Sequence, residues 1–154
     1  YRKERNETYI YNRASGKRLE PPVSGMWYTR FDPFDLDGAF FVRRNSSQEF
    51  SVHRLDLRNN TSEIPILISN GKPRSLFVDQ SSLYWLESDN SVTQPGIQHL
   101  WRYDRRLKDS AQVTSLTGMM PRHYGFTIGP NGNSVIYGKL SETQTDIVLI
   151  RDFE

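Results

Sequence analysis

The chain has 154 residues, of which 36% are hydrophobic and 25% are charged, and 20 Lys and Arg against 18 Asp and Glu leave a net charge of +2. This length suffices for one domain with a buried core, and the near balance of charge argues against a dedicated nucleic-acid surface, which concentrates uncompensated Lys and Arg. Cys is absent, which excludes disulfides, thiol catalysis and Cys-ligated zinc, and no apolar run approaches the roughly 20 residues of a membrane span.

Short β-branched and aromatic runs, bounded by Gly, Pro, Asn and Asp, predict consecutive antiparallel strands. In chain order the expected strands are 8–12, 17–23, 26–31, 39–43, 50–57, 64–68, 73–78, 83–86, 99–104, 112–116, 126–128, 134–137 and 146–150. Pro21 and Pro22 place the second of these at a sheet edge, because proline cannot donate to a ladder. No amphipathic helix with capping residues is visible, so the chain is predicted to be all-β.

A fixed period links these strands. The third strand of each set ends on a polar residue that follows a large one, in Tyr11-Asn12, Leu55-Asp56, Tyr103-Asp104 and Arg151-Asp152. Asp56, Asp104 and Asp152 follow one another at intervals of 48 residues, and Asn12 precedes Asp56 by 44. A unit of about 40 to 50 residues with four strands is typical of a β-propeller blade, because one twisted sheet cannot bury both faces and blades therefore stack.

We therefore expect residues 1–154 to form a single partial propeller of about three and a half blades. The expected blades are 8–23 (half), 26–68, 73–117 and 123–154 (three strands). Propellers typically need at least four blades to close. The favoured expectation is further blades before Tyr1, and the alternative is a second copy of the chain that completes the ring as a homo-oligomer.

The turn at Gly129-Pro130-Asn131-Gly132-Asn133, within 126–137, resembles the Ser-Pro-Asp-Gly-Lys turn of TolB-like (PD40, WD40-like) propeller blades. Residues 35–41 and 79–85 are looser copies. Residues 145–153 are similar to the closing blade of the propellers at the C-termini of CadC-like, membrane-tethered winged-helix transcriptional regulators.

The CadC-like resemblance implies a cytoplasmic DNA-binding domain, one membrane span and a periplasmic, extracytoplasmic sensory domain, of which this chain is the last part. We accordingly expect a non-enzymatic module that recognises a protein or small-molecule signal. This segment is expected to bind no nucleic acid directly, to need no cofactor and to be membrane-associated only through a missing upstream segment.

Two other propeller classes stay open. Residues 83–89 followed by 99–104 resemble the YWTD blades of lipoprotein-receptor propellers, although Leu86 and Glu87 replace the threonine and aspartate of that motif. The chain could also be the gating propeller of a prolyl-oligopeptidase-like hydrolase. That reading requires a hydrolase domain beyond Glu154.

No residue pattern predicts catalysis or a metal site. His53 precedes Asp56 by three residues, where Trp101 precedes Asp104 and Leu149 precedes Asp152, so it occupies a packing position. His99 and His123 lack partners at ligand spacing. The sequence around Ser134 lacks the second glycine of a nucleophile elbow, and Asp35 and Asp37 are typical turn residues that bond to their own backbone.

Aromatic side chains make up 12% of the chain. Most would pack between blades, and a few at the rim or channel would contact a partner. The candidate interaction surface consists of Trp27, Tyr28, Trp85, Trp101, Arg102, Tyr103 and Tyr124.

Overall fold

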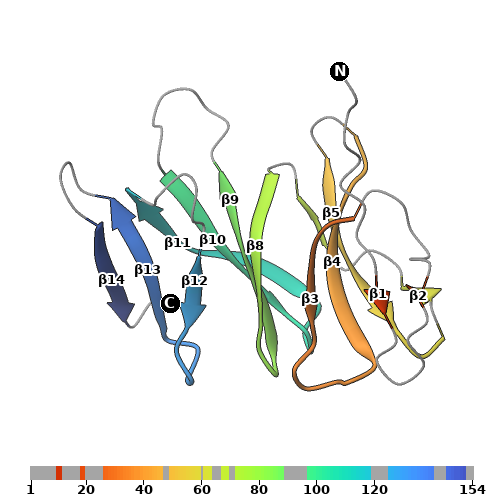
Figure 1. Ribbon diagram of the computed structural model, residues 1–154. Coiled ribbons are helices and arrows are strands. Elements are labelled where there is room, and N and C mark those ends of the chain that lie inside the picture. The colour runs from red at the N-terminus through yellow and green to blue at the C-terminus, as the bar shows by residue number, and fades with distance from the viewer. Residues whose placement is uncertain are drawn as a thin grey trace. The chain divides into compact units, whose positions relative to one another are not determined.

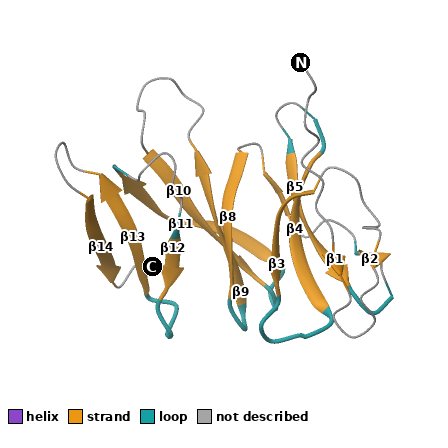
Figure 2. Ribbon diagram, in the orientation of Figure 1, coloured by secondary structure: helices purple, strands orange, loops and turns teal. Residues whose placement is uncertain are grey.

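The computed structural model confirms that the protein is all-β. It describes residues 10–11, 18–19, 26–46, 49–59, 61–63, 67–69, 72–88, 97–118, 125–140 and 145–151. Within these ranges strands are joined by loops and turns (Figures 1 and 2), and none of the described residues forms a helix that could cross a membrane. The chain divides into two compact units, residues 1–70 and 71–154.

The first unit contains a two-stranded pair and a larger antiparallel sheet. The pair is β1 (Ile10–Tyr11) with β2 (Arg18–Leu19), and the sheet begins β3 (Met26–Phe31), β4 (Gly38–Arg44) and β5 (Phe50–Asp56). Two short strands, β6 (Thr61–Ser62) and β7 (Leu67–Ser69), both pair with β5. The single fourth strand predicted at 64–68 is thus wrong in its bounds, and residues 64–66 lie outside the described part of the chain.

The second unit contains two antiparallel sheets in sequential order. The first is β8 (Lys72–Val78), β9 (Ser82–Ser88), β10 (Ile97–Asp104) and β11 (Asp109–Thr117), and the second is β12 (Phe126–Ile128), β13 (Ser134–Leu140) and β14 (Thr145–Arg151). The seven strands predicted here are confirmed, most of them longer than expected. Four strands paired in chain order form the unit predicted for a propeller blade.

The two sheets of the second unit share one apolar core. Successive side chains of a strand point to opposite faces, and one face of each sheet supplies Tyr84, Leu86, Leu100, Leu116, Ile128, Val135 and Tyr137, all buried. The Tyr137 hydroxyl also donates a hydrogen bond to the Thr117 carbonyl oxygen across 3.4 Å. Burial of the β8–β11 sheet therefore depends on the β12–β14 sheet, as expected for stacked blades.

The cross-strand register defines a common frame for the three large sheets. Gly38 lies opposite Asp56, Ser82 opposite Asp104, and Ser134 opposite Arg151. Each of these second-strand residues also closes the preceding turn, by accepting a bond at its carbonyl from Asp32, Asp79 or Gly129. The residue equivalent to Asp56 and Asp104 in the last sheet is therefore Arg151.

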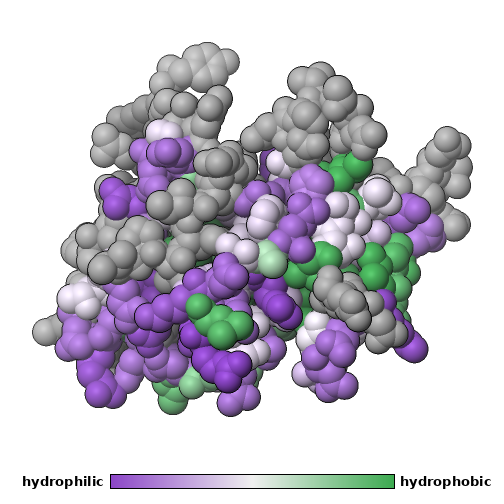
Figure 3. Space-filling model, turned by 180° about the vertical axis from the view of Figure 1, so that it is seen from behind, coloured by the Kyte–Doolittle hydropathy of each residue, from purple (hydrophilic) through white to green (hydrophobic). Residues whose placement is uncertain are grey.

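The predicted repeat at Asp152 is thus displaced by one residue, and a shift of one residue moves a strand's side chains to the opposite face. Val148, which pairs with Tyr137, takes the inward position that was assigned to Leu149. Leu149 pairs with Ile136 on the outer face instead. The exposed fractions are 37% for Ile136, 44% for Leu149 and 82% for Ile147, and apolar surface is visible where this sheet lies (Figure 3).

Candidate functional site

The repeated aspartates at positions 56 and 104 cap a tight turn. Asp56 Oδ1 accepts hydrogen bonds from the backbone amides of Arg58 (2.9 Å) and Asn59 (3.0 Å). Asp104 Oδ1 accepts two bonds of 2.8 Å from the amides of Arg106 and Leu107. These amide bonds lower the pKa of both carboxyl groups, because they favour the charged form. The interval of 48 residues between Asp56 and Asp104 therefore reflects the same capping role at equivalent turns.

A solvent-open hollow lies at the tight-turn end of the second unit, between its two sheets. One wall is the β8–β9 turn, in which the Asp79 amide donates to the Ser82 carbonyl oxygen (2.9 Å), and the other is the β12–β13 turn. These turns point to the same end of the unit (Figure 1). The hollow has a volume of about 360 Å³ and is lined by Asp79, Gln80, Ser81, Ser82, Tyr84, Arg102, Asp104, Pro130, Asn131, Gly132 and Asn133.

The β12–β13 wall is held in shape by Gly132. Its φ of 72° lies in the left-handed region, which glycine adopts without steric cost. Its amide donates to the Gly129 carbonyl oxygen across 2.9 Å. A Cβ at this position would lie 3.3 Å from the Tyr84 hydroxyl oxygen, so glycine also permits close approach of the turn to β9.

Tyr84 and Arg102 lie directly opposite each other on β9 and β10. Tyr84 is only 2% exposed, whereas Arg102 is exposed and continues the same sheet face beyond the apolar core. Burial raises the pKa of Tyr84, while hydrogen bonds with Ser82 and Arg102 act in the opposite direction. A guanidinium group beside a buried hydroxyl provides several hydrogen-bond donors to a molecule in the hollow.

The two carboxylates of the hollow have local partners. Asp104 caps the β10–β11 turn, and Asp79 Oδ1 accepts a hydrogen bond from the Gln80 amide across 2.8 Å. Arg105 stabilises the neighbouring backbone by donating to the carbonyl oxygens of Asp79 (3.2 Å) and Gln80 (3.3 Å). Both acidic groups are therefore explained by the geometry of the turns.

The first unit has a smaller hollow of about 220 Å³ at its own turn end, lined by Asp35, Asp37, Arg54, Asp56, Arg58 and Asn59. Ion pairs cross it. Arg54 pairs with Asp35 and with Glu63, the latter at 2.5 Å, and Arg58 pairs with Asp37 at 2.5 Å. The Asp37 amide donates to Asp35 Oδ1, which confirms that Asp35 bonds to its own turn. The charges of this hollow are thus compensated within the unit.

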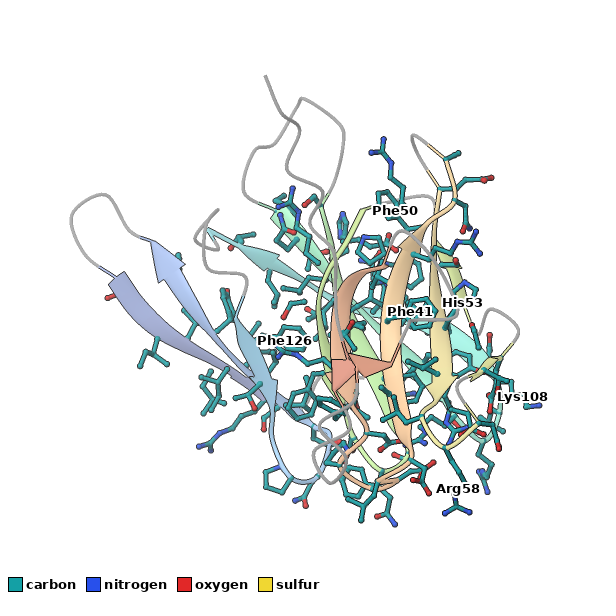
Figure 4. The ribbon with its side chains drawn as sticks, turned by 45° about the vertical axis from the view of Figure 1, so that its right-hand side comes forward. Phe41, Phe50, His53, Arg58, Lys108 and Phe126 are labelled. Atoms are coloured by element: carbon teal, nitrogen blue, oxygen red, sulfur yellow. The ribbon has the colours of Figure 1, made fainter. Side chains whose placement is uncertain are left out.

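The prediction that His53 occupies a packing position is confirmed. The residue is 5% exposed, and its ring stacks on Phe41, with centroids 5.0 Å apart and planes 12° apart (Figure 4). At the equivalent position of the second unit Trp101 stacks on Trp85, at 6.1 Å and 13°. His53 Nε2 lies 2.7 Å from Ser51 Oγ, but Ser51 is fully buried, so this pair presents no nucleophile to solvent.

The predicted interaction residues fall into different environments. Trp85 (1% exposed) and Tyr103 (7%) are buried, Trp101 is partly buried in the stack, and Arg102 is exposed in the hollow. Trp27 and Tyr28 lie on β3, but their side chains are not described, and Tyr124 lies outside the described residues. Burial removes Trp85 and Tyr103 from the exposed surface, because both side chains fill positions where strands pack.

Tyr84 and the two walls of the hollow were not predicted as site residues. The signal that would have indicated them is the cross-strand register, which places Tyr84 opposite Arg102. Within the described ranges no group of three or more His, Asp and Glu side chains is arranged to hold a metal ion. His99 Nδ1 lies 2.9 Å from Ser115 Oγ, and His123 is outside those ranges.

Comparisons with known proteins identify the fold. No family model and no curated sequence matches the chain. Among solved structures it is similar to TolB from Acinetobacter baumannii, with a TM-score of 0.63, 17% identity and coverage of 93% of this chain and 34% of that one. It is also similar to the acylaminoacyl peptidase of Pyrococcus horikoshii (0.63, 16%, 95% and 26%).

The third structure is the β-propeller domain of the Trilobed protease from Pyrococcus furiosus, with a TM-score of 0.58 and 17% identity. The match covers 95% of this chain and 46% of that domain. The chain thus has the fold of propeller blades and spans a quarter to less than half of the chains it matches.

Proposed function

We propose that the chain is a segment of a TolB-like propeller that acts as a non-enzymatic binding module, with its recognition surface at the turn end of the second unit. The observation that carries this proposal is the polar hollow of about 360 Å³ between two sheets. Its walls are tight turns fixed by backbone hydrogen bonds, so its hydrogen-bonding groups are held in place before a ligand arrives. Pre-organisation of this kind favours binding.

We further propose that binding serves a sensory role in an extracytoplasmic domain. The resemblance of residues 145–153 to the closing blade of CadC-like regulators supports this role. A bound protein or small molecule would favour one state of an attached output domain, provided that the two states differ in affinity for it.

The alternative is the gating propeller of a hydrolase. Its support is the similarity to the acylaminoacyl peptidase and to the propeller domain of the Trilobed protease. In that case the propeller would select substrates, and a separate domain would supply the catalytic groups. The hollow would then contact the substrate or the neighbouring domain.

The sequence of the gene that encodes the chain distinguishes the two proposed functions. A winged helix and a membrane span encoded upstream would support the sensor, whereas a Ser-Asp-His hydrolase domain encoded on the same chain would support the peptidase. The intact protein should be incubated with an N-acetylated dipeptide, and release of the free amino acid should be followed. We expect no hydrolysis; turnover abolished by an active-site serine inhibitor would contradict the binding module.

A further inference from the structure

The common frame of the sheets reveals a pair of equivalent arginines with different surroundings. Arg54 on β5 and Arg102 on β10 each lie two residues before the turn-capping aspartate, Asp56 or Asp104. The strand partners agree, because Phe40 lies opposite Arg54 and Tyr84 lies opposite Arg102. Each guanidinium group therefore lies at the turn end of the equivalent face of its own sheet.

Arg54 is neutralised from two sides within its own unit. Glu63 follows β6, and its carboxylate lies 2.5 Å from the Arg54 guanidinium. Asp35, in the β3–β4 turn, forms the second ion pair. An arginine with two carboxylate partners has most of its donors occupied.

The surroundings of Arg102 differ from those of Arg54. Its neighbour on the adjoining strand is Ala111, at the position that Glu63 has beside Arg54. The β8–β9 turn closes over Asp79–Ser82, whereas the β3–β4 turn closes over Asp32–Gly38. Asp79 stands three residues before Ser82, as Asp35 stands three residues before Gly38, but Asp79 Oδ1 accepts a hydrogen bond from the Gln80 amide and forms no ion pair with Arg102. Among the described residues no carboxylate forms an ion pair with Arg102.

The remaining groups around Arg102 are polar and can form hydrogen bonds with a ligand. The exposed residues Ser81, Asn131 and Asn133 contribute a hydroxyl and two amides to the same hollow. Asp79 and Asp104 also face it, but both cap their own turns. Arg102 attracts the Asp104 carboxylate and lowers its pKa, but the two groups form no ion pair, so Arg102 is the charged group of the hollow that takes no part in closing a turn.

We infer that Arg102 is the anchor of a carboxylate subsite, and that the hollow binds a Glu or Asp side chain from an acidic segment of a partner protein. The incoming carboxylate would supply in trans what Glu63 and Asp35 supply to Arg54 in cis. Arginine binds carboxylates through two parallel hydrogen bonds. The amides of Asn131 and Asn133 can hydrogen-bond to the backbone on either side of that residue.

This inference rests on the proposed binding function but can fail separately from it. The gene architecture and the hydrolysis assay test whether the protein is a binding module. A titration of the labelled protein with small carboxylates tests only the ligand chemistry at Arg102. A carboxylate subsite would remain if a hydrolase domain were found, and a binding module would remain if the subsite were disproved.

The test is a titration of the intact protein, labelled with ¹⁵N-arginine, with four probes: N-acetylglutamate amide, its neutral analogue N-acetylglutamine amide, N-acetyl-lysine amide and inorganic phosphate. The Arg102 Nε signal is assigned from its loss in Arg102→Gln. We expect N-acetylglutamate amide to shift that signal saturably and to bind at least about tenfold more tightly than its neutral analogue. Phosphate and the lysine probe should bind more weakly.

Two variants and one control make the test specific. Arg102→Gln should weaken binding of the carboxylate at least about tenfold. Ala111→Glu places a carboxylate where Glu63 lies beside Arg54, and it should weaken binding of the probe by up to about fivefold through competition, without removing any group from the hollow. Arg106→Gln removes a nearby exposed cation that does not line the hollow, and it should leave affinity unchanged.

The inference is overturned if the carboxylate and its neutral analogue bind equally, or if Arg102→Gln or Ala111→Glu leaves carboxylate binding unchanged. Tighter binding of phosphate than of N-acetylglutamate amide would show an anion site of a different class and would overturn the inference. Preferential binding of N-acetyl-lysine amide would show that Asp79 and Asp104 determine the ligand, which also overturns it.

Discussion

The β3–β7 sheet of the first unit and the β8–β11 sheet of the second have the same frame and use it differently. Their packing positions are alike, since Phe41 stacks on His53 in one and Trp85 stacks on Trp101 in the other. Their turn ends differ, because Arg54 forms two ion pairs within its unit and Arg102 forms none with the described residues. The comparison shows that packing constrains the strand interiors, whereas the turn ends can diverge.

The largest expected effect concerns the buried face. Leu100 on β10 and Ile147 on β14 are equivalent, because they pair with Leu86 and Gly138 on the preceding strands. Leu100 is fully buried and Ile147 is 82% exposed. Leu100→Ala should lower the free energy of unfolding by about 2–5 kcal/mol, and Ile147→Ala should change it by less than about 0.5 kcal/mol.

Urea denaturation of the 154-residue chain measures both changes. Equal losses at the two positions would show that another sheet covers the outer face of β13 and β14. That result would contradict the difference in burial between the two sheets.

A second expected effect is at the wall of the hollow. Gly132→Ala should destabilise the protein by about 1–2 kcal/mol, because alanine is strained at a φ of 72°, and its Cβ would crowd the Tyr84 hydroxyl. Gly138→Ala is the control. A Cβ there meets no atom within 4 Å, and alanine is favoured over glycine in a strand by roughly 0.5–1 kcal/mol. Similar thermal unfolding of the two variants would contradict the account of the turn.

A third prediction concerns the pH dependence of stability, to which His53 contributes and Trp101 at the equivalent position does not. Burial lowers the pKa of His53, and the nearby charge of Arg43 lowers it further, against a hydrogen bond with the Glu63 carbonyl oxygen that raises it. The folded protein therefore holds His53 neutral below 6.5, where the unfolded chain binds a proton. Stability from this residue is present above pH 6.5 and is lost as pH falls toward the lowered pKa.

The measurement is urea denaturation at pH 7.5 and at pH 5.5. His53→Phe keeps an aromatic ring for the Phe41 stack and should remove this part of the pH dependence. The same loss of stability in His53→Phe as in the parent would assign the effect to other groups.

Much of this arrangement could be predicted from the sequence. Strand positions followed from the runs of β-branched and aromatic residues between turn signals. The spacing of Asp56 and Asp104 marked the ends of two equivalent strands, and the structure shows that both side chains cap the turn that follows. The packing position of His53 followed from its alignment with Trp101. These predictions succeeded because strand alternation and turn capping are local.

Other features depended on register, which spacing alone does not determine. The equivalence of Asp152 with Asp104 failed by one residue, and this reversed the faces assigned to Val148 and Leu149. The hollow was missed because it combines the turns of two sheets. The sequence placed Arg102 in a mainly aromatic candidate surface. Its significance lies in the absence of a carboxylate at Ala111, which the sequence shows only after strand pairing is known.

The central claim, that Glu63 and Ala111 occupy equivalent places beside Arg54 and Arg102, is tested most directly by a double-mutant cycle on unfolding free energy. Ala111→Glu should stabilise the protein by about 0.2–1 kcal/mol through a new ion pair with Arg102. In the Arg102→Gln background the same substitution should give no stabilisation. An equal effect of Ala111→Glu in both backgrounds would contradict the common frame.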